Sequence, residues 1–268
     1  MTRIVHLTDL HFGQERVEFV NPLMRAVRLT EPDLVVVSGD LTHRGRVDQF
    51  RKAMAFLNAL GRPFTVVPGN HDVPLFNLPK RLLSPFRNWR KGTGLPTTSD
   101  NDLGPLKVVT ANTADPLQWR GGILRDDDVA RIRADLSTFD DRTTCAVLVC
   151  HHPLKEPPGF DRGETKGAAE ALPGLINTGV RIVLSGHLHS WEIGLGIAQG
   201  SPRPVLMVQT GTALCAREGE VDHGFSVLDI QANEVSVTPW LVNEDQAVFG
   251  PKETHRFSRK GDLWYLRA

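Results

Sequence analysis

Apolar and amphipathic segments alternate along the first quarter of the chain. Strands are predicted over Arg3–Thr8, Leu34–Ser38 and Phe64–Val67, and helices over Glu18–Leu29 and Val47–Leu60. The strand segments are short and rich in β-branched residues, whereas the helical segments place apolar residues on one face at a period of about 3.6. Gly61 and Pro63 end the second helix. This order predicts two successive βαβ units.

The alternation continues through the middle of the chain. Further strands are predicted over Leu106–Thr110, Cys145–Cys150 and Val180–Ser185, with helices over Asp126–Thr138 and Lys166–Thr178. The parallel-sheet pattern therefore extends to about residue 185. Two stretches, Pro74–Gly104 and Pro153–Thr165, lack periodicity and are expected to be long loops, which in compact enzymes are often lids or binding loops.

The pattern changes after Ser201. Consecutive strand-like segments follow one another with short turns, over Val205–Gln209, Gly224–Ile230 and Glu234–Leu241. They predict a second sheet that is mainly antiparallel. We expect one main domain over residues 1–242 and a C-terminal extension over residues 243–268, whose apolar cluster Leu263–Leu266 packs on the domain or on a partner subunit in a homodimer.

Composition and charge narrow the function classes. The 268 residues include 31 basic and 31 acidic side chains, so the formal charge is zero, which argues against bulk nucleic-acid binding. No apolar run approaches the roughly 18 residues of a membrane span. The N-terminus has no apolar stretch typical of a secretion signal. Cys145 and Cys150 should point to opposite faces of one strand and cannot pair, so we expect a cytoplasmic protein.

Five polar clusters follow predicted strands. They are Asp9-Leu10-His11, Gly39-Asp40, Gly69-Asn70-His71-Asp72, His151-His152-Pro153 and Gly186-His187-Leu188-His189. Ligands of such sheets bind outside the carboxyl ends of the strands, so these clusters should converge. Carboxylates, an amide oxygen and imidazoles form a mixed donor set that suits manganese, iron or zinc. The glycines let the backbone turn sharply or approach a ligand closely.

Together the five clusters resemble those of the calcineurin-like metallophosphoesterases, most closely the small bacterial phosphodiesterases of the cyclic-nucleotide type. The resemblance implies an α/β (α+β) fold, a four-layer αββα sandwich of two central mixed β-sheets flanked by helices. It also implies two metal ions per chain, which could be manganese, iron or zinc. One ion would be held by Asp9, His11, Asp40 and His189, and the other by Asp40, Asn70, His151 and His187.

The same resemblance implies roles for two further residues. His71 would lie over the phosphate and protonate the leaving oxygen, and Asp72 would orient the His71 ring. Asp40 would bridge the two ions, so that a shared water becomes the attacking hydroxide.

Three more positions are candidates for contacts to the site. His43 stands where related phosphodiesterases carry an acidic residue, and it could lie behind the ligands, contact phosphate or bind metal. His152 is expected to pack beside its neighbouring ligand. Asn112 could line the pocket, although turn formation is the commoner role of an Asn after a strand.

Trp89 and Trp119 are expected to be packing residues, with base stacking as the alternative.

The resulting hypothesis is a metal-dependent phosphoester hydrolase that acts on a small phosphorylated substrate. A phosphodiester, such as a cyclic nucleotide or another small diester, is the favoured substrate class. The alternatives are a phosphomonoesterase, a lipid-precursor pyrophosphatase with Leu75–Leu83 as its apolar lid, and a non-catalytic binding scaffold; a nuclease ranks last. The loops at residues 74–104, 153–165 and 190–203 are expected to form the specificity pocket.

Overall fold

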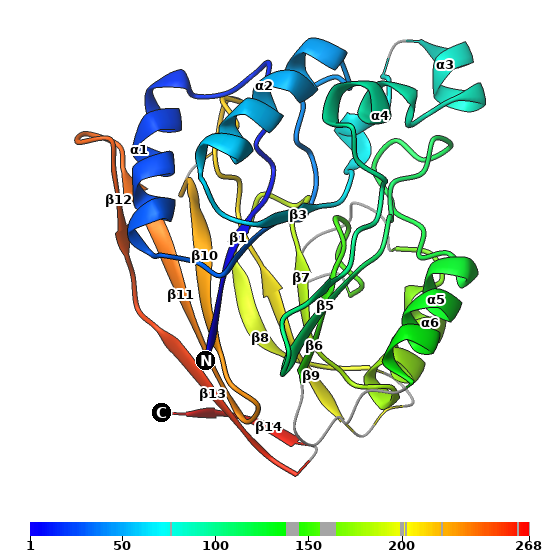
Figure 1. Cartoon of the computed structure of the whole chain (residues 1–268), viewed down its shortest axis with the longest axis vertical. Coiled ribbons are helices and arrows are strands. Elements are labelled where there is room, and N and C mark those ends of the chain that lie inside the picture. The colour runs from blue at the N-terminus through cyan, green and yellow to red at the C-terminus, as the bar shows by residue number, and fades with distance from the viewer. Residues whose placement is uncertain are drawn as a thin grey trace.

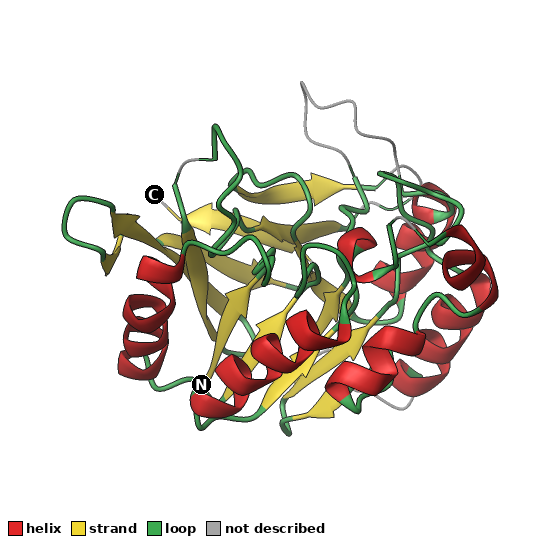
Figure 2. Ribbon diagram, turned by 90° about the horizontal axis from the view of Figure 1, so that it is seen from above, coloured by secondary structure: helices red, strands yellow, loops and turns green. Residues whose placement is uncertain are grey.

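Two mixed β-sheets pack face to face in the computed structural model, and helices cover the outer face of each sheet. The structure describes residues 1–75, 77–137, 145–155, 165–198, 201, 203–220, 222–261 and 263–267. Figure 1 shows α1 on one side of the molecule and α5 and α6 on the other. From above, helices lie to the left of the strands, along their lower side and to their right (Figure 2). The predicted four-layer arrangement of two mixed sheets between helices is confirmed.

The first sheet combines the N-terminal and C-terminal parts of the chain. Its strands, in spatial order, are β14 (Leu263–Arg267), β13 (His255–Lys260), β11 (Glu234–Asn243), β10 (Gly224–Ile230), β1 (Thr2–Leu7), β2 (Leu34–Val37) and β3 (Phe64–Val66), and β12 (Val248–Pro251) also pairs with β11. β1, β2 and β3 run parallel, connected by α1 (Val17–Leu29) and α2 (Val47–Ala59), as the two βαβ units predict. β10 pairs antiparallel with β1.

The second sheet is built from the middle of the chain. Its strands, in spatial order, are β4 (Asn101–Asp102), β5 (Leu106–Thr110), β6 (Cys145–Val149), β7 (Val180–Ser185), β9 (Pro204–Gln209) and β8 (Glu192–Ile197). α5 (Asp126–Leu136) and α6 (Ala168–Asn177) connect the parallel strands β5, β6 and β7. The predicted last residue of the first of these helices, Thr138, lies outside the described residues.

Three apolar layers follow from the alternation of side chains along the strands. On β1, Val5 and Leu7 face α1 and α2, whereas Ile4 points into the layer between the sheets. Successive strand residues point to opposite faces, so one strand serves two cores. Cys145 lies between the sheets and Cys150 lies under α5 and α6, as their odd spacing predicts. All three cysteines of the chain are free.

The strands after residue 201 do not form a separate antiparallel sheet, so that prediction is wrong. β9 lies beside β7 in the second sheet and runs parallel to it, whereas β10 and β11 complete the first sheet. The reason is that a strand's partner is set by distant chain segments that share a buried face, and local periodicity carries no information on it. β8, within the expected loop at residues 190–203, pairs antiparallel with β9.

The stretch Pro74–Gly104 is also more ordered than its composition predicts. It contains α3 (Leu78–Leu83) and α4 (Arg87–Thr93), as well as β4. The Asn77 side chain accepts a hydrogen bond from the Lys80 amide and caps α3, while Trp89 anchors α4 against Phe50 of α2. Tertiary packing therefore stabilises helices too short to form alone. In the other expected loop, residues 156–164 lie outside the described residues.

The C-terminal segment continues the first sheet. The boundary expected at residue 242 falls within β11, and β13 and β14 add two antiparallel strands to the sheet edge. Trp264 is buried in the layer between the sheets, whereas Leu266 is exposed. Residues 255–267 thus pack on their own chain, and the division at residue 242 and a homodimer through this edge both stay predictions.

The helices of the described part of the chain are short. α1 and α2 have 13 residues each. None of the described helices has both the length and the apolar character needed to cross a bilayer.

Removal of the Trp89 side chain tests how α4 is held. Trp89 is fully buried, and its indole nitrogen donates to the carbonyls of Leu95 and Pro96. We expect Trp89→Ala to lower the free energy of unfolding by about 3–5 kcal/mol, measured by urea denaturation, because a large cavity remains. Tyr265→Ala, which removes a half-exposed ring on β14, should change it by only about 0.5 kcal/mol. Equal losses in the two variants would contradict this packing.

Candidate metal centre

The five polar clusters meet where the carboxyl ends of strands from both sheets come together. Asp9, His11, Asp40 and Asn70 follow β1, β2 and β3 of the first sheet, and His151, His187 and His189 follow β6 and β7 of the second. Because the sheets pack face to face, these side chains are brought together between them. The predicted convergence is confirmed, since the donor atoms lie within hydrogen-bonding distance of one another.

An unusual backbone conformation orients many of these side chains. Asp9, His11, Asp40, His187 and His189 all have positive φ angles, between 48° and 72°. In the described part of the chain, only three other non-glycine residues share this left-handed conformation: Glu31, Asp222 and Ala247. Left-handed backbone costs such residues roughly 1–2 kcal/mol each. The concentration of this left-handed conformation in the polar clusters points to a functional site.

Two glycines allow the chain segments to approach one another. A Cβ atom at Gly69 would lie 2.1 Å from Oδ1 of Asp40, and one at Gly186 would lie 1.9 Å from Oγ1 of Thr8. These distances are far below van der Waals contact, so a larger residue would push apart the loops that carry the donors. Glycine is thus needed at both positions for the close approach of two chain segments, whereas the expected approach to a bound ligand stays a prediction.

Asp40 occupies the middle of the cluster. Its Oδ2 lies 3.6 Å from Nε2 of His11 and 3.5 Å from Nε2 of His151. On one side, Nε2 of His189 lies 3.0 Å from Oδ1 of Asp9. On the other side, Oδ1 of Asn70 lies 3.2 Å from Nε2 of His151. One carboxylate oxygen thus faces two groups of donors, as a bridging ligand must.

Several of these side chains are held through their second polar atom. Oδ2 of Asp9 accepts hydrogen bonds from Thr8 Oγ1 and from the His187 amide, at 2.6 Å and 3.0 Å. Oδ1 of Asp40 accepts from the His71 amide at 2.8 Å. Nδ1 of His151 donates to the Ser38 carbonyl at 2.8 Å. The remaining oxygen or nitrogen of each side chain is directed into the centre, which fixes the ligand orientation.

Glu220 holds His189 in the same way and was not predicted from the sequence. Nδ1 of His189 donates to Oε1 of Glu220 at 2.6 Å, which leaves Nε2 for the centre. Glu220 lies 31 residues after His189 and outside all five clusters. No local pattern marks such a partner, because the contact depends on how the segment after β9 folds back.

The two carboxylates are strongly anionic. Burial alone would raise the pKa of Asp40, but the imidazoles of His151 and His71 outweigh this and hold the pKa below its usual range. Burial alone would raise the pKa of Asp9 as well, but the imidazoles of His189, His11 and His151 together hold it well below its usual range. Buried anions of this kind attract cations.

Two imidazoles carry the complementary charge. Burial lowers the pKa of His151, but the neighbouring Asp40 more than compensates and raises it to about 9. His189 shows the same balance, with Asp9 the main group that raises its pKa to about 9. Without a metal ion, protons on these rings neutralise the carboxylates. The donor set therefore fits divalent ions, which would replace those protons.

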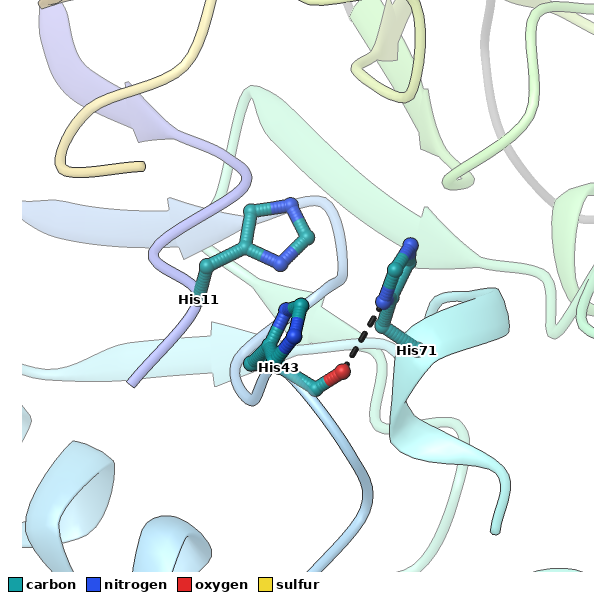
Figure 3. Close-up of side chains that lie close together, drawn as sticks. All are labelled: His11, His43 and His71. Atoms are coloured by element: carbon teal, nitrogen blue, oxygen red, sulfur yellow. Dashed lines mark hydrogen bonds between the residues drawn. The ribbon is translucent and has the colours of Figure 1, made fainter. Parts of the chain in front are cut away.

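His71 lies beside the cluster with its ring held by backbone. Nδ1 of His71 donates to the carbonyl oxygen of His43 at 2.9 Å (Figure 3). The His43 ring stacks on the His71 ring with centroids 5.6 Å apart, and the His11 ring meets His71 edge-on at 4.9 Å. Burial, His71 and His11 together lower the pKa of His43 to about 4, so this ring is neutral near pH 7.

The expected pairing of Asp72 with His71 is wrong. The Asp72 carboxylate instead accepts hydrogen bonds from the amides of Leu41, Thr42 and Gly69, and from the Thr42 hydroxyl. It ties the loop after β2 to the loop after β3. Burial and then the nearby Asp40 raise its pKa to about 7. Asp72 therefore positions the loops that carry Asp40 and Asn70.

His152 and Asn112 have structural partners away from the centre. Nδ1 of His152 lies 2.9 Å from the Thr113 hydroxyl, and its ring packs against the rings of His151 and His187 at 4.9 Å and 4.6 Å. Oδ1 of Asn112 accepts from the Ala114 amide, as in a turn. His152 thus packs behind two candidate ligands, and Asn112 shapes its own loop.

A cavity of about 420 Å³ opens over the donor cluster. Besides Asp40, Asn70, His71, His187 and His189, its walls include Trp119, Arg120 and Arg217. The two arginines were not predicted from the sequence, and Trp119 had been expected to be a packing residue. They come from the segments after β5 and β9, which carry no recognisable motif.

Comparison with known proteins identifies relatives. Residues 2–191 match the family model described as calcineurin-like phosphoesterase. The chain is 31% identical over 212 residues to the glycerophosphodiester phosphodiesterase GpdQ of Enterobacter lignolyticus, covering 70% of each chain. It is also 31% identical over 261 residues to a probable cyclic nucleotide phosphodiesterase of Xenorhabdus bovienii, covering 88% of this chain and 98% of the relative.

The fold has counterparts among solved structures. A dimetal phosphatase from Danio rerio superposes with a TM-score of 0.67 over 97% of this chain and 99% of its own, at 15% identity. This likeness concerns the fold.

Metal binding should release protons from the centre. At about pH 7.5 the imidazoles of His151 and His189, with pKa values raised to about 9, hold protons that a cation must displace. We expect Mn²⁺ addition to metal-free protein to release about one to two protons per chain, measured in buffers of different ionisation enthalpy. The release should fall to about half near pH 9 and vanish above about pH 10, where both rings are already neutral. His255→Gln, on β13, serves as the control; equal heats in all buffers would contradict the expectation.

Proposed function

The chain belongs to the calcineurin-like phosphoesterase family, and on this premise we propose that it hydrolyses phosphodiesters at a centre of two metal ions. It is a metal-dependent phosphoester hydrolase. The observation that carries the proposal is the position of Asp40 Oδ2 between two groups of buried donors, 3.6 Å from His11 Nε2 and 3.5 Å from His151 Nε2.

The proposed ligand assignment divides the cluster at Asp40. One ion is assigned to Asp9, His11, Asp40 and His189, and the other to Asp40, Asn70, His151 and His187. The contacts support this division, because Nε2 of His11 and Nε2 of His189 lie 3.2 Å apart, and Nδ1 of His187 lies 3.1 Å from Oδ1 of Asn70. The ligand types suit manganese, iron or zinc.

The bound ions would supply positive charge against the phosphoryl oxygens and lower the pKa of a water so that it can attack phosphorus. Proton transfer to the leaving oxygen and positioning of the loops are the proposed roles of the chain's own residues. His71 faces the cavity with its Nδ1 proton held by the His43 carbonyl, which leaves Nε2 available to transfer a proton to the leaving oxygen. Asp72 keeps the loops with Asp40 and Asn70 in register.

The choice of a diester rests on the relatives, one named a glycerophosphodiester phosphodiesterase and the other a probable cyclic nucleotide phosphodiesterase. A non-catalytic scaffold is disfavoured because all seven donor positions are filled by metal-binding residue types. We place the protein in a reducing compartment such as the cytoplasm, since its three cysteines are free and buried.

A lipid-linked phosphoester is a second candidate substrate, favoured by one observation. Leu78, Leu82 and Leu83 are all exposed on α3. Arg81 of the same helix donates to the carbonyls of Pro116 and Gln118, so α3 packs against the segment that leads to Trp119 of the cavity wall. Exposed apolar residues beside a polar cavity suit an amphiphilic substrate.

A substrate panel tests the proposed function. Manganese-loaded protein should hydrolyse bis(p-nitrophenyl) phosphate with a higher kcat/KM than p-nitrophenyl phosphate, and should act on cyclic nucleotides or glycerophosphodiesters. Preference for the monoester would overturn the diester assignment, and turnover confined to micellar phospholipid would favour the lipid alternative.

Asp40→Asn should reduce kcat/KM by about 10³-fold and lower metal content, because the position proposed to be shared by both ions loses its negative charge. Asp229→Asn, which removes a carboxylate paired with Arg3, is the matched control.

A separate variant tests His71. His71→Ala should retain the metal content of the parent protein while kcat for a diester with an alkoxide leaving group, such as a cyclic nucleotide, falls about 10²–10³-fold. The reason is that His71 donates only its amide to a candidate ligand, so the loop can persist without the ring. Metal content is measured by elemental analysis and turnover by chromatographic assay of the nucleotide product. Normal kcat in this variant would exclude the proposed proton transfer.

A further inference from the structure

We infer that Arg120 and Arg217, together with Trp119, form a subsite for a second anionic group of the substrate. The substrate class is then a phosphodiester that carries another phosphate or a carboxylate on one ester arm. The inference rests on the proposed function, because it concerns the same cavity, but it assigns residues that hold no metal.

The backbone that carries Arg120 is firmly attached to the centre. The carbonyl of Trp119 accepts a hydrogen bond from Nδ2 of Asn70 at 3.3 Å, so residues 119 and 120 follow the position of a candidate ligand. Arg81 of α3 holds the preceding residues of the same loop, because its guanidinium donates to the carbonyls of Pro116 and Gln118 at 2.6 Å and 2.7 Å. Arg81 is only 2% exposed. These contacts fix the backbone of the loop in the free protein, so substrate binding requires little further ordering of this cavity wall.

Trp119 is part of the same wall. Its ring lies 4.6 Å from the Arg81 guanidinium carbon, which covers one side, while 54% of the residue stays exposed. A ring supported from behind and open in front offers a surface for a planar part of the substrate.

The positive charge of Arg120 has no counter-charge among the residues that the structure describes. Its side chain is exposed at the cavity and forms no ion pair with any residue in the described parts of the chain. Arg217 has a partial counter-charge, because its Nη1 lies 3.7 Å from Oε1 of Glu220. That same oxygen already accepts the shorter bond from His189, at 2.6 Å. Both guanidinium groups therefore keep bonding capacity for a ligand.

The charge of a simple diester does not account for these arginines. A diester has one negative charge at the phosphorus that is attacked, and the metal ions would face that charge. Two guanidinium groups on the remaining wall are then left to bind a further anion, and their planar forks suit phosphate or carboxylate. A diester with a quaternary ammonium arm would be disfavoured there by repulsion.

A pair of matched substrates tests the subsite. Thymidine 5′-(p-nitrophenyl phosphate) and its 3′-phosphorylated derivative share the diester, the base and the leaving group, and differ only in the second phosphate. We expect kcat/KM to be about tenfold or more higher for the 3′-phosphorylated substrate in the manganese-loaded protein. Hydrolysis of both at equal kcat/KM would overturn the inference while leaving the proposed function intact.

Variants assign the preference to particular side chains. Arg120→Gln and Arg217→Gln should each reduce the ratio of the two kcat/KM values, and Arg120→Lys should retain part of it because charge remains without the fork. Arg267→Gln is the control. Arg267 lies on β14, pairs with Glu234 and does not line the cavity, so this variant should keep the parent ratio. A preference that survives in both glutamine variants would also overturn the inference.

If neither substrate is hydrolysed, the result counts against the proposed function. The subsite is then tested by a binding measurement. Thymidine 3′,5′-bisphosphate and thymidine 5′-phosphate are titrated calorimetrically into manganese-loaded protein. The subsite requires the bisphosphate to bind about tenfold more tightly, and Arg120→Gln to remove most of that difference. Equal affinities would refute the subsite independently of turnover.

Discussion

The contact of two buried carboxylates with a group of imidazoles, between the two sheets, is the interaction on which the rest of the structure depends. Asp9 and Asp40 are almost completely buried, and an unpaired buried carboxylate would be very costly. Here each uses one oxygen for fixed hydrogen bonds from the protein and directs the other at imidazole nitrogens. The arrangement is neutralised by protons in the metal-free protein and has the form of a cation site.

This arrangement also explains why the fold needs two sheets. Strands of a single parallel sheet would place all donors in one row, whereas here Asp40 of the first sheet lies beside His151 of the second. The apolar layer between the sheets fixes their separation, so its packing sets the distances in the centre. The left-handed residues at the strand ends are strained, and the large core supplies the stability that tolerates this strain.

The sequence allowed the donor cluster to be predicted because each donor follows a strand directly, so its place in the fold depends on local order. The helices α1, α2, α5 and α6 were predictable for the same reason, from their apolar periodicity. The pairing of β9 with β7 and of β10 with β1 was not, since partners distant in the chain are chosen by shared burial. Glu220, Arg120 and Arg217 were missed because they reach the site from segments without periodicity or motif.

His43 shows how a departure from the family pattern can leave the essential geometry intact. The side chain differs from the acidic residue of related phosphodiesterases, yet the group that orients His71 is the backbone carbonyl of residue 43, which any amino acid provides. The ring takes a different part, since it stacks on His71 and limits the directions in which that ring can turn. Because burial and its imidazole neighbours keep His43 neutral, it restricts His71 without adding charge to the centre. Substitution at this position is therefore expected to act first on the freedom of the His71 ring.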